Sequence, residues 1–348
     1  MPPSLLRPAP VSIEGAAPLD GDTPPDEAAA RLLEGGRWLV TDRVATGLSV
    51  LARLEVLLPE PGPGADHAER RAHRQAFEAA ARRLLAPVEG GRIALDGAEG
   101  IGFLRQLYPD LATFALPVFE LERLRRAWRI YREGVHLAVL GHRLHPFWGT
   151  YVPTRTEHLE LFGTWLSQHR GPRGRAVDVG TGCGVMAFML CKVGFAPVLA
   201  TDTNPNAIES VRRQLERMSP TPQLTPRCTD LLGGERAPAD LIAFNPPWTQ
   251  GEVDGPLDGA LHFAPGLFER FFDQAWTRLS PEGRVVLVFS NLIELVQPEI
   301  PHPIRTELVR GRFREVQTLR RKIKPAPGPE GHRRITRERV EVWELARA

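Results

Sequence analysis

A chain of 348 residues, 42% of them hydrophobic and 25% charged, is long enough for one large α/β domain and a smaller companion, since domains usually span about 100 to 200 residues. No run of about 18 apolar residues predicts a membrane span, and three scattered cysteines, Cys183, Cys191 and Cys228, exclude a disulfide framework or a zinc site. The net charge of +2 names no partner. Residues 1–10 have no apolar stretch of signal-peptide length, so we expect a cytoplasmic protein. Because the cysteines are few and scattered, we expect no metal.

The first part of the chain divides into two segments. Residues 1–24 are rich in proline and lack periodic apolar residues, which predicts a flexible leader. In residues 25–140, apolar residues recur with a period near 3.6 in stretches that begin near Glu27, Val44 and Ala68. We predict a helical amino-terminal domain here, with substrate recognition as its role.

After about residue 141, short apolar segments alternate with amphipathic ones, which is typical of a parallel sheet with crossover helices. The predicted strands are residues 175–180, 197–202, 223–230, 239–245, 284–290, 313–320 and 337–345. The predicted helices are residues 185–193, 205–218, 266–279 and 303–311. Residues 141–348 therefore form the second predicted domain.

The first of these strands ends in the glycine-rich sequence Asp178-Val-Gly-Thr-Gly-Cys-Gly184, and a helix follows at once. Glycines at these positions allow a sharp turn and a close approach of the backbone to a ligand, where a Cβ atom would intrude. A dinucleotide-binding turn would need Gly or Ala three positions after the second glycine, and Val185 stands there. The spacing disfavours NAD.

Two aspartates end the next two predicted strands. Asp202 lies 22 residues beyond Gly180, where a carboxylate can accept hydrogen bonds from both ribose hydroxyls of an adenosyl group. Its alternative role is to cap the following helix, although Asn204 is better placed for that. Asp230 is positioned to hold the adenine amino group while Leu231 packs against the ring. An ordinary turn aspartate is the alternative.

The fourth predicted strand runs directly into Asn245-Pro-Pro-Trp248, at the carboxyl end of the sheet, where open α/β folds bind ligands. A corner with these residue types suits the transfer of a methyl group from a sulfonium to nitrogen. Such a transfer is an in-line displacement, so the enzyme must direct a nitrogen lone pair along the carbon–sulfur axis of the sulfonium. The side-chain oxygen of Asn245 and the carbonyl oxygen of Pro246 can accept the two hydrogens of a planar amine. The prolines stiffen the loop, and Trp248 offers a flat face for stacking. The alternative is a proline-terminated strand with a buried tryptophan.

Residues 145–348 resemble the class I methyltransferases that bear the (Asn/Asp)-Pro-Pro-aromatic signature, in particular the release-factor glutamine N5-methyltransferase family and its methyltransferase small domain relatives. The resemblance implies a Rossmann-like α/β fold, with a seven-stranded mixed sheet whose last strand is antiparallel, and S-adenosyl-L-methionine as the cofactor. It implies that the cofactor is lined by Asp178, Gly180, Thr181, Gly182, Gly184, Asp202, Thr203, Asp230 and Leu231. The acceptor would meet Asn245, Pro246, Pro247 and Trp248. The chain departs from the glutamine enzymes in having Trp248 instead of Tyr, and Tyr151-Val-Pro-Thr-Arg-Thr-Glu157 instead of Ile-Pro-Arg-Pro-Glu-Thr-Glu.

The sequence leaves the acceptor open. In such a sheet, the loop of residues 321–336 should open on the active-site face, and the basic residues on or beside it would suit phosphates: Arg320, Arg321, Lys322, Lys324, Arg333, Arg334 and Arg337. A solvated hairpin tip is the alternative. Residues 251–263, with Glu252, Asp254, Asp258 and His262, are expected to fold over the acceptor. We expect a macromolecular substrate, RNA, DNA or protein. A small-molecule N-methyltransferase and a cofactor-binding protein that has lost catalysis are the alternatives.

Overall fold

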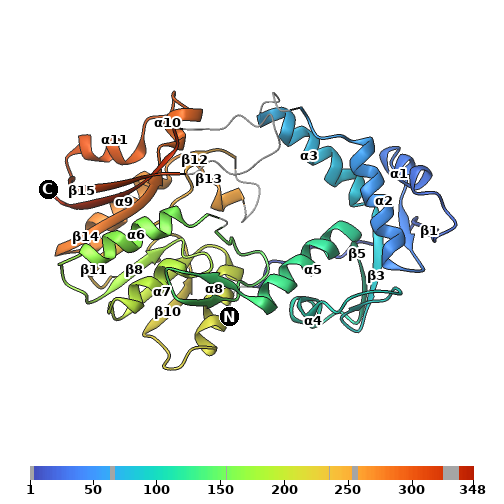
Figure 1. The fold of residues 1–348 in the computed structure, drawn as a ribbon, viewed down its shortest axis with the longest axis horizontal. Helices are drawn as coiled ribbons and strands as arrows, with labels where there is room; N and C mark the ends of the chain where they lie inside the picture. Colours follow the sequence, from blue (N-terminus) through green and yellow to red (C-terminus); the bar gives the residue numbers. More distant parts are fainter. Residues whose placement is uncertain (1–3, 63–66, 154, 235, 253–257, 324–336) are drawn as a thin grey trace. The chain divides into compact units, whose positions relative to one another are not determined.

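The computed structural model describes residues 4–62, 67–153, 155–234, 236–252, 258–323 and 337–348 (Figure 1). These residues fall into two compact units. The amino-terminal unit comprises residues 7–130, and the larger unit comprises residues 131–323 and 337–348 together with residues 4–6.

The amino-terminal unit combines helices with a sheet. The predicted helices are present as α1 (Pro25–Leu33), α2 (Val44–Leu57) and α3 (His67–Ala81), followed by α4 (Gly102–Leu107) and α5 (Val118–Glu133). Helix α1 begins with a proline at its first position and two acidic residues in its first turn, which favours a helix start. Between these helices lie the strands β1 (Ala17–Leu19), β2 (Trp38–Val40), β3 (Leu84–Glu89), β4 (Arg92–Ile93) and β5 (Thr113–Pro117).

These strands correct two predictions. They form one five-stranded sheet in the order β1-β2-β3-β4, with β5 paired to β3, so the description of this part as helical was incomplete. Strands of two to six residues are too short for an alternation of period two to stand out against helical spacing. Strand β1 lies inside the predicted flexible leader, where it pairs in parallel with β2 and buries Leu19 completely.

The larger unit contains a seven-stranded sheet in the order β10-β9-β8-β11-β14-β16-β15. Its strands are β8 (Ala176–Val179), β9 (Val198–Asp202), β10 (Leu224–Cys228), β11 (Ala239–Phe244), β14 (Leu279–Ser290), β15 (Phe313–Lys322) and β16 (Arg339–Arg347). Strand β16 pairs antiparallel with both β14 and β15, whereas the other pairings are parallel. The predicted Rossmann-like mixed sheet with an antiparallel last strand is confirmed.

Helices cover both faces of this sheet, which explains the continuous apolar runs of its strands. Leu241 and Ala243 of β11 face one core, with α6 (Glu157–Gln168), α7 (Val185–Lys192) and α8 (Pro205–Glu216) contributing to it. Ile242 and Phe244 face the other core, with α9 (Leu267–Arg278) and α11 (Pro303–Arg310). Trp248 packs against both cores, because it lies just beyond the end of β11 where they meet.

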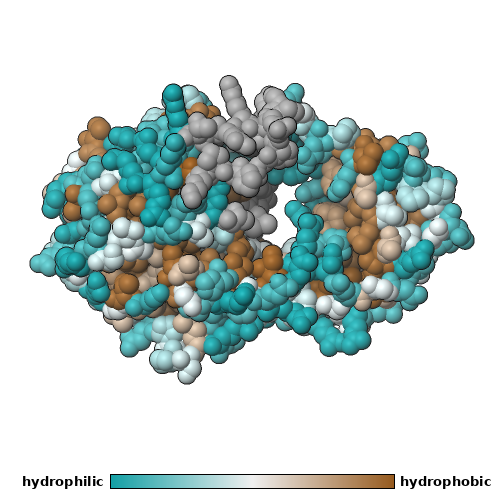
Figure 2. Space-filling model, viewed as in Figure 1, coloured by the Kyte–Doolittle hydropathy of each residue, from teal (hydrophilic) through white to brown (hydrophobic). Residues whose placement is uncertain are grey.

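Shorter elements complete the larger unit. They are β6 (Val135–Leu137), β7 (His142–Leu144), β12 (Thr249–Gln250), a 3-10 turn at Asp258–Ala260, β13 (His262–Phe263) and α10 (Leu292–Val296). Hydrophilic residues cover most of the visible surface, with smaller hydrophobic areas among them (Figure 2). Across the described ranges, no helix has the length and apolar character needed to cross a bilayer.

Candidate active site

A cavity of about 820 Å³ opens at the carboxyl ends of the parallel strands of the larger unit. Strands that run in the same direction end at one edge of a sheet, so the turns after β8, β9, β10 and β11 meet there. All but one of the predicted site residues line this cavity: Asp178, Gly180, Thr181, Gly182, Asp202, Thr203, Asp230, Leu231, Asn245, Pro246, Pro247 and Trp248.

The glycine turn between β8 and α7 has three left-handed positions, with φ of +62° at Gly180, +54° at Gly182 and +87° at Gly184. Gly184 is the residue that does not line the cavity. A Cβ atom there would lie 2.9 Å from side-chain carbons of both Phe188 and Val211. Gly184 therefore allows α7 to pack closely, and its predicted place against the cofactor is corrected on that ground.

Asp178 fastens the glycine turn to the helix that follows. Its Oδ2 atom accepts hydrogen bonds from Thr181 Oγ1 at 2.6 Å and from the backbone N of Ala187 at 2.9 Å. Burial raises the pKa of Asp178 to about 7, and these two hydrogen bonds oppose the shift. The carboxyl group is thus committed to shaping the turn from beneath.

Asp202 connects the end of β9 to the same turn. Its Oδ2 atom accepts from the backbone N of Gly182 at 2.9 Å, and its Oδ1 atom accepts from the backbone N of Asn204 at 2.8 Å. Burial raises the pKa of Asp202, while the backbone hydrogen bonds lower it. Asn204 caps α8, since its side chain accepts from the backbone N of Asn206 at 2.9 Å. Each oxygen of Asp202 keeps a lone pair for a further donor in the cavity.

The turn after β10 presents Asp230 and Leu231. Asp230 is exposed, and its carboxylate lies 3.6 Å from the guanidinium of Arg270. Leu231 is buried with a φ of +47°, a left-handed conformation that costs a leucine on the order of 1 kcal/mol or more. Such strain is often held at ligand sites, and here it keeps the leucine side chain in the cavity wall.

The corner after β11 brings its own side chains together. The indole Nε1 of Trp248 donates a hydrogen bond to Asn245 Oδ1 at 3.3 Å. Pro246, which lies between these two residues in the sequence, is buried. At 3.3 Å this hydrogen bond is long. A carbonyl-type oxygen has two lone pairs, so Asn245 Oδ1 can accept one more hydrogen.

His158, on α6, is a cavity residue that the sequence analysis missed. Its imidazole makes an edge-to-face contact with Trp248, with ring centroids 5.7 Å apart and planes at 88°. Burial lowers the pKa of His158 to about 4, so the ring is neutral near pH 7. The signal available in the sequence was the helical spacing of Leu159, Phe162 and Leu166 in a segment to which no helix was assigned.

Residues 160–322, a little under half of the chain, match the family model of the methyltransferase small domain. The match confirms the prediction of a methyltransferase domain that uses S-adenosylmethionine. It lies on the larger unit and contains the glycine turn, both strand-end aspartates and the Asn245–Trp248 corner.

Curated proteins to which this chain is similar include ribosomal protein L11 methyltransferases. The protein from Bacillus pumilus (strain SAFR-032) is 26% identical over 194 residues, which cover 50% of this chain and 57% of the relative. The protein from Symbiobacterium thermophilum is 30% identical over 147 residues, which cover 36% and 46%. The chain thus spans about half the length of these relatives.

The chain also has similarity to solved structures, at low sequence identity. The ribosomal protein L11 methylase from Lactobacillus delbrueckii subsp. bulgaricus has a TM-score of 0.41 and 19% identity, and the match covers 59% of this chain and 84% of that one. A methyltransferase from Pyrococcus furiosus has a TM-score of 0.41 and 17% identity, with 66% and 98% covered.

In the methyltransferase domain, a short pair of strands adjoins the Asn245–Trp248 corner. Strand β12 pairs in parallel with β13, and Thr249 Oγ1 lies 2.9 Å from His262 Nδ1. Gln297 holds β12 from the other side through both backbone groups of Gln250, at 2.9 and 2.7 Å. Residues 259–264 line the cavity, whereas Asp254 of the predicted acceptor-covering segment lies outside the described residues.

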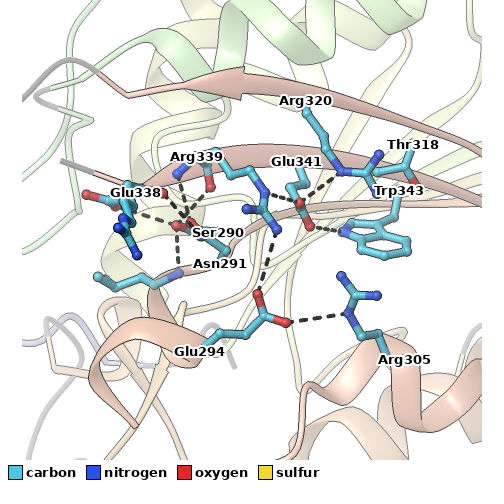
Figure 3. Close-up of polar contacts among 12 residues, drawn as sticks. Ser290, Asn291, Glu294, Arg305, Thr318, Arg320, Glu338, Arg339, Glu341 and Trp343 are labelled. Carbon is cyan, nitrogen blue, oxygen red and sulfur yellow. Dashed lines mark hydrogen bonds and ion pairs between the residues drawn. The ribbon is translucent and has the colours of Figure 1, made fainter. Parts of the chain in front are cut away.

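A polar cluster fixes the end of β14 next to the cavity (Figure 3). Ser290 Oγ donates to the carbonyl oxygen of Arg339 at 3.2 Å and accepts from the backbone N of Leu292 at 3.1 Å. Asn291 Oδ1 accepts from the backbone N of Arg339 at 2.8 Å. Leu292, a cavity residue, is thereby positioned by Arg339, the first residue of strand β16.

The predicted basic loop is only partly described. Lys324, Arg333 and Arg334 lie outside the described residues. Arg320 is bound 3.1 Å from the fully buried Glu341, and Arg321 lies 2.6 Å from Glu160 (Figure 3 shows the Arg320 pair). Both arginines are ion-paired with carboxylates of the domain, and Glu341 is shared between Arg320 and Arg339. In the described part of the chain, no group of His, Cys, Asp or Glu side chains is arranged to hold a metal ion.

Proposed function

We propose that this protein is an S-adenosylmethionine-dependent N-methyltransferase that acts on a planar amide or exocyclic amine nitrogen of a macromolecule, either a nucleic acid base or a protein glutamine. One observation carries the proposal: the glycine turn after β8 and the Asn245–Trp248 corner after β11 line the same cavity. The similarity to enzymes named for ribosomal protein L11 supports a macromolecular acceptor.

The residues of the cavity fit the cofactor. The carboxylate of Asp202 would receive the ribose hydroxyls, with Gly182 N already fixing its orientation. Asp178 and Thr181 hold the turn that brings Gly180 and Gly182 close to the ligand. Thr203, Asp230 and Leu231 would surround the adenine end. When bound, S-adenosylmethionine supplies an electrophilic methyl group on a sulfonium.

The acceptor side of the cavity orients the nitrogen. One hydrogen of the amine is accepted by the second lone pair of Asn245 Oδ1 and the other by the carbonyl oxygen of Pro246, which favours a pyramidal nitrogen. With S-adenosylmethionine bound, a nitrogen held in this way would be able to form the N–C bond as the C–S bond breaks, with S-adenosylhomocysteine as the leaving group and one proton released to solvent. Orientation of this kind is the main source of acceleration in a displacement between two bound groups.

Labelling distinguishes the acceptor classes. The RNA, DNA, protein and small-molecule fractions of a bacterial lysate are tested in separate reactions. Each reaction contains the protein and S-adenosyl-[methyl-³H]methionine. We expect label in one macromolecular fraction, and loss of at least about 99% of it with Asn245→Ala, the scale expected for a misoriented nucleophile. Label confined to the small-molecule fraction would instead support the small-molecule alternative, and equal labelling by Asn245→Ala would refute the assigned chemistry.

We also propose residues 25–140 as the substrate-recognition part.

A further inference from the structure

The cavity separates acidic groups from neutral ones. The carboxylates among its described lining residues are Asp178, Asp202 and Asp230, and each stands at or beside the end of β8, β9 or β10. Around the corner after β11, the polar lining side chains of the described chain include Asn245, Thr249, His158 and His262, none of which carries a negative charge. We call this second region the acceptor half.

Most polar groups of the acceptor half are engaged with each other. Thr249 Oγ1 is bonded to His262 Nδ1, and Asn245 Oδ1 accepts from Trp248. His158 differs from them. It is only 6% exposed and lines the cavity, and its ring makes no hydrogen bond that the structure records within the described ranges. Neither ring nitrogen is among the fully buried atoms of the described chain that lack a partner, so the ring keeps a nitrogen accessible from the cavity.

We propose that His158 is a specificity-determining residue of the acceptor half, which hydrogen-bonds a neutral planar acceptor through a ring nitrogen and disfavours an alkylammonium group. The inference rests on the proposed function, because it concerns the same methyl acceptor. The imidazole is in contact with the indole of Trp248, with the ring planes at 88°, and both side chains line the cavity, so a group bound beside Trp248 is close to His158.

The charge of the lining residues explains why an alkylammonium group is disfavoured. An ammonium group in this region would lose its hydration and would find no carboxylate among the described acceptor-half residues. An unpaired buried charge is far more costly than a buried amide with its hydrogen bonds made. A neutral amide or base can instead donate an N–H to His158, or accept one from it, according to the tautomer of the ring.

Kinetics with matched variants test the hydrogen bond. The fraction that the wild type labels serves as substrate for His158→Phe, which keeps a flat ring, and His158→Gln, which restores a donor and an acceptor. We expect His158→Phe to raise KM about tenfold, as for one lost hydrogen bond, and His158→Gln to recover most of that loss. His169→Phe is the control, since His169 is equally buried at the end of the same helix but outside the cavity. An unchanged KM in His158→Phe, with unchanged affinity for S-adenosylhomocysteine, would overturn the proposal.

A second measurement does not depend on turnover. Imidazole ¹⁵N signals are recorded for the protein saturated with S-adenosylhomocysteine, and the His158 signals are identified by their loss in His158→Phe. Benzamide should shift them and n-butylammonium should not. No shift with benzamide, or an equal shift with n-butylammonium, would overturn the proposal. Methylated lysine in the labelled fraction would refute it and leave the methyltransferase standing. A benzamide shift without any methyl transfer would refute the proposed function alone.

Discussion

The indole nitrogen of Trp248 donates a hydrogen bond to Asn245 Oδ1 across the two prolines that separate them. The tryptophan therefore does two things in the corner: it offers a flat face, and it orients the amide whose oxygen is proposed to hold the acceptor nitrogen. The same indole packs against both cores of the sheet. The orientation of Asn245 therefore depends on the packing on both faces of the sheet.

The two roles of Trp248 can be separated by substitution. Trp248→Phe keeps an aromatic face but loses the N–H, so we expect kcat to fall about fivefold, the effect of one modest hydrogen bond. Trp248→Ala loses both and should lower kcat by about a hundredfold or more, because the amide and the acceptor would be misplaced. Steady-state methyl transfer to the labelled fraction measures this. Equal losses in the two variants would show that the hydrogen bond, rather than the face, dominates.

Cofactor binding and turnover should respond to different residues. Asp202→Ala removes the carboxylate that orients Gly182 N, so we expect affinity for S-adenosylhomocysteine to fall at least about tenfold. Asn245→Ala should leave this affinity within about twofold of the wild type while kcat collapses, because it removes the hydrogen bond to Trp248 and the proposed contact to the acceptor but no contact proposed for the cofactor. Calorimetric titration and single-turnover transfer provide the two numbers. A similar loss of affinity in both variants would contradict the division of the cavity.

Gly184 should be sensitive to a methyl group for a packing reason. Gly184→Ala places a Cβ atom 2.9 Å from Phe188 and Val211 in a left-handed residue, so we expect the free energy of unfolding to fall by about 2 to 4 kcal/mol. Gly194→Ala is the matched control, since Gly194 has a φ of +96° but no atom within 4 Å of its added Cβ. It should show only the cost of backbone strain. Urea unfolding of both variants measures the difference, and equal losses would argue against the clash.

His158 should contribute to acid destabilisation. Its pKa is near 4 in the folded protein and about 6.5 in the unfolded chain, so the unfolded state binds the extra proton between these values. Its contribution to stability is therefore fully present above about pH 6.5 and is lost as the pH falls towards 4. His158→Phe lacks this linkage. Its unfolding free energy relative to the wild type should rise between pH 7 and pH 4, by on the order of 3 kcal/mol. A pH-independent difference would contradict the burial of a neutral ring.

The sheet of the larger unit could be predicted because its strands are buried on both faces. Strands such as Ala239–Phe244 are short apolar runs bounded by turn residues, and Asn204-Pro205 marks the start of a helix. The cavity residues followed from the rule that parallel strands end at one edge. Gly184 was assigned to the wrong role because a glycine required by Phe188 and Val211 looks the same in sequence as one required by a ligand.

The missing parts depend on contacts distant in the sequence. Among the described residues, strand β1 pairs with β2 alone, and α1 lies between them in sequence. Nothing local in Ala17–Leu19 indicates that pairing. His158 enters the cavity because α6 packs on the sheet beside Trp248, 90 residues later in the chain. Its partner is a feature of tertiary packing, which the helical periodicity of residues 157–168 alone would not have disclosed.

The position of β16 matters while the protein is being made. Its two partners, β14 and β15, both precede it in the chain, and they have no pairing with each other in the finished sheet. Until residues 339–347 leave the ribosome, β14 presents an open hydrogen-bonding edge rich in valine and leucine, the kind of edge that recruits foreign strands. Newly made chains that stall before this point should be targets for chaperones and for aggregation.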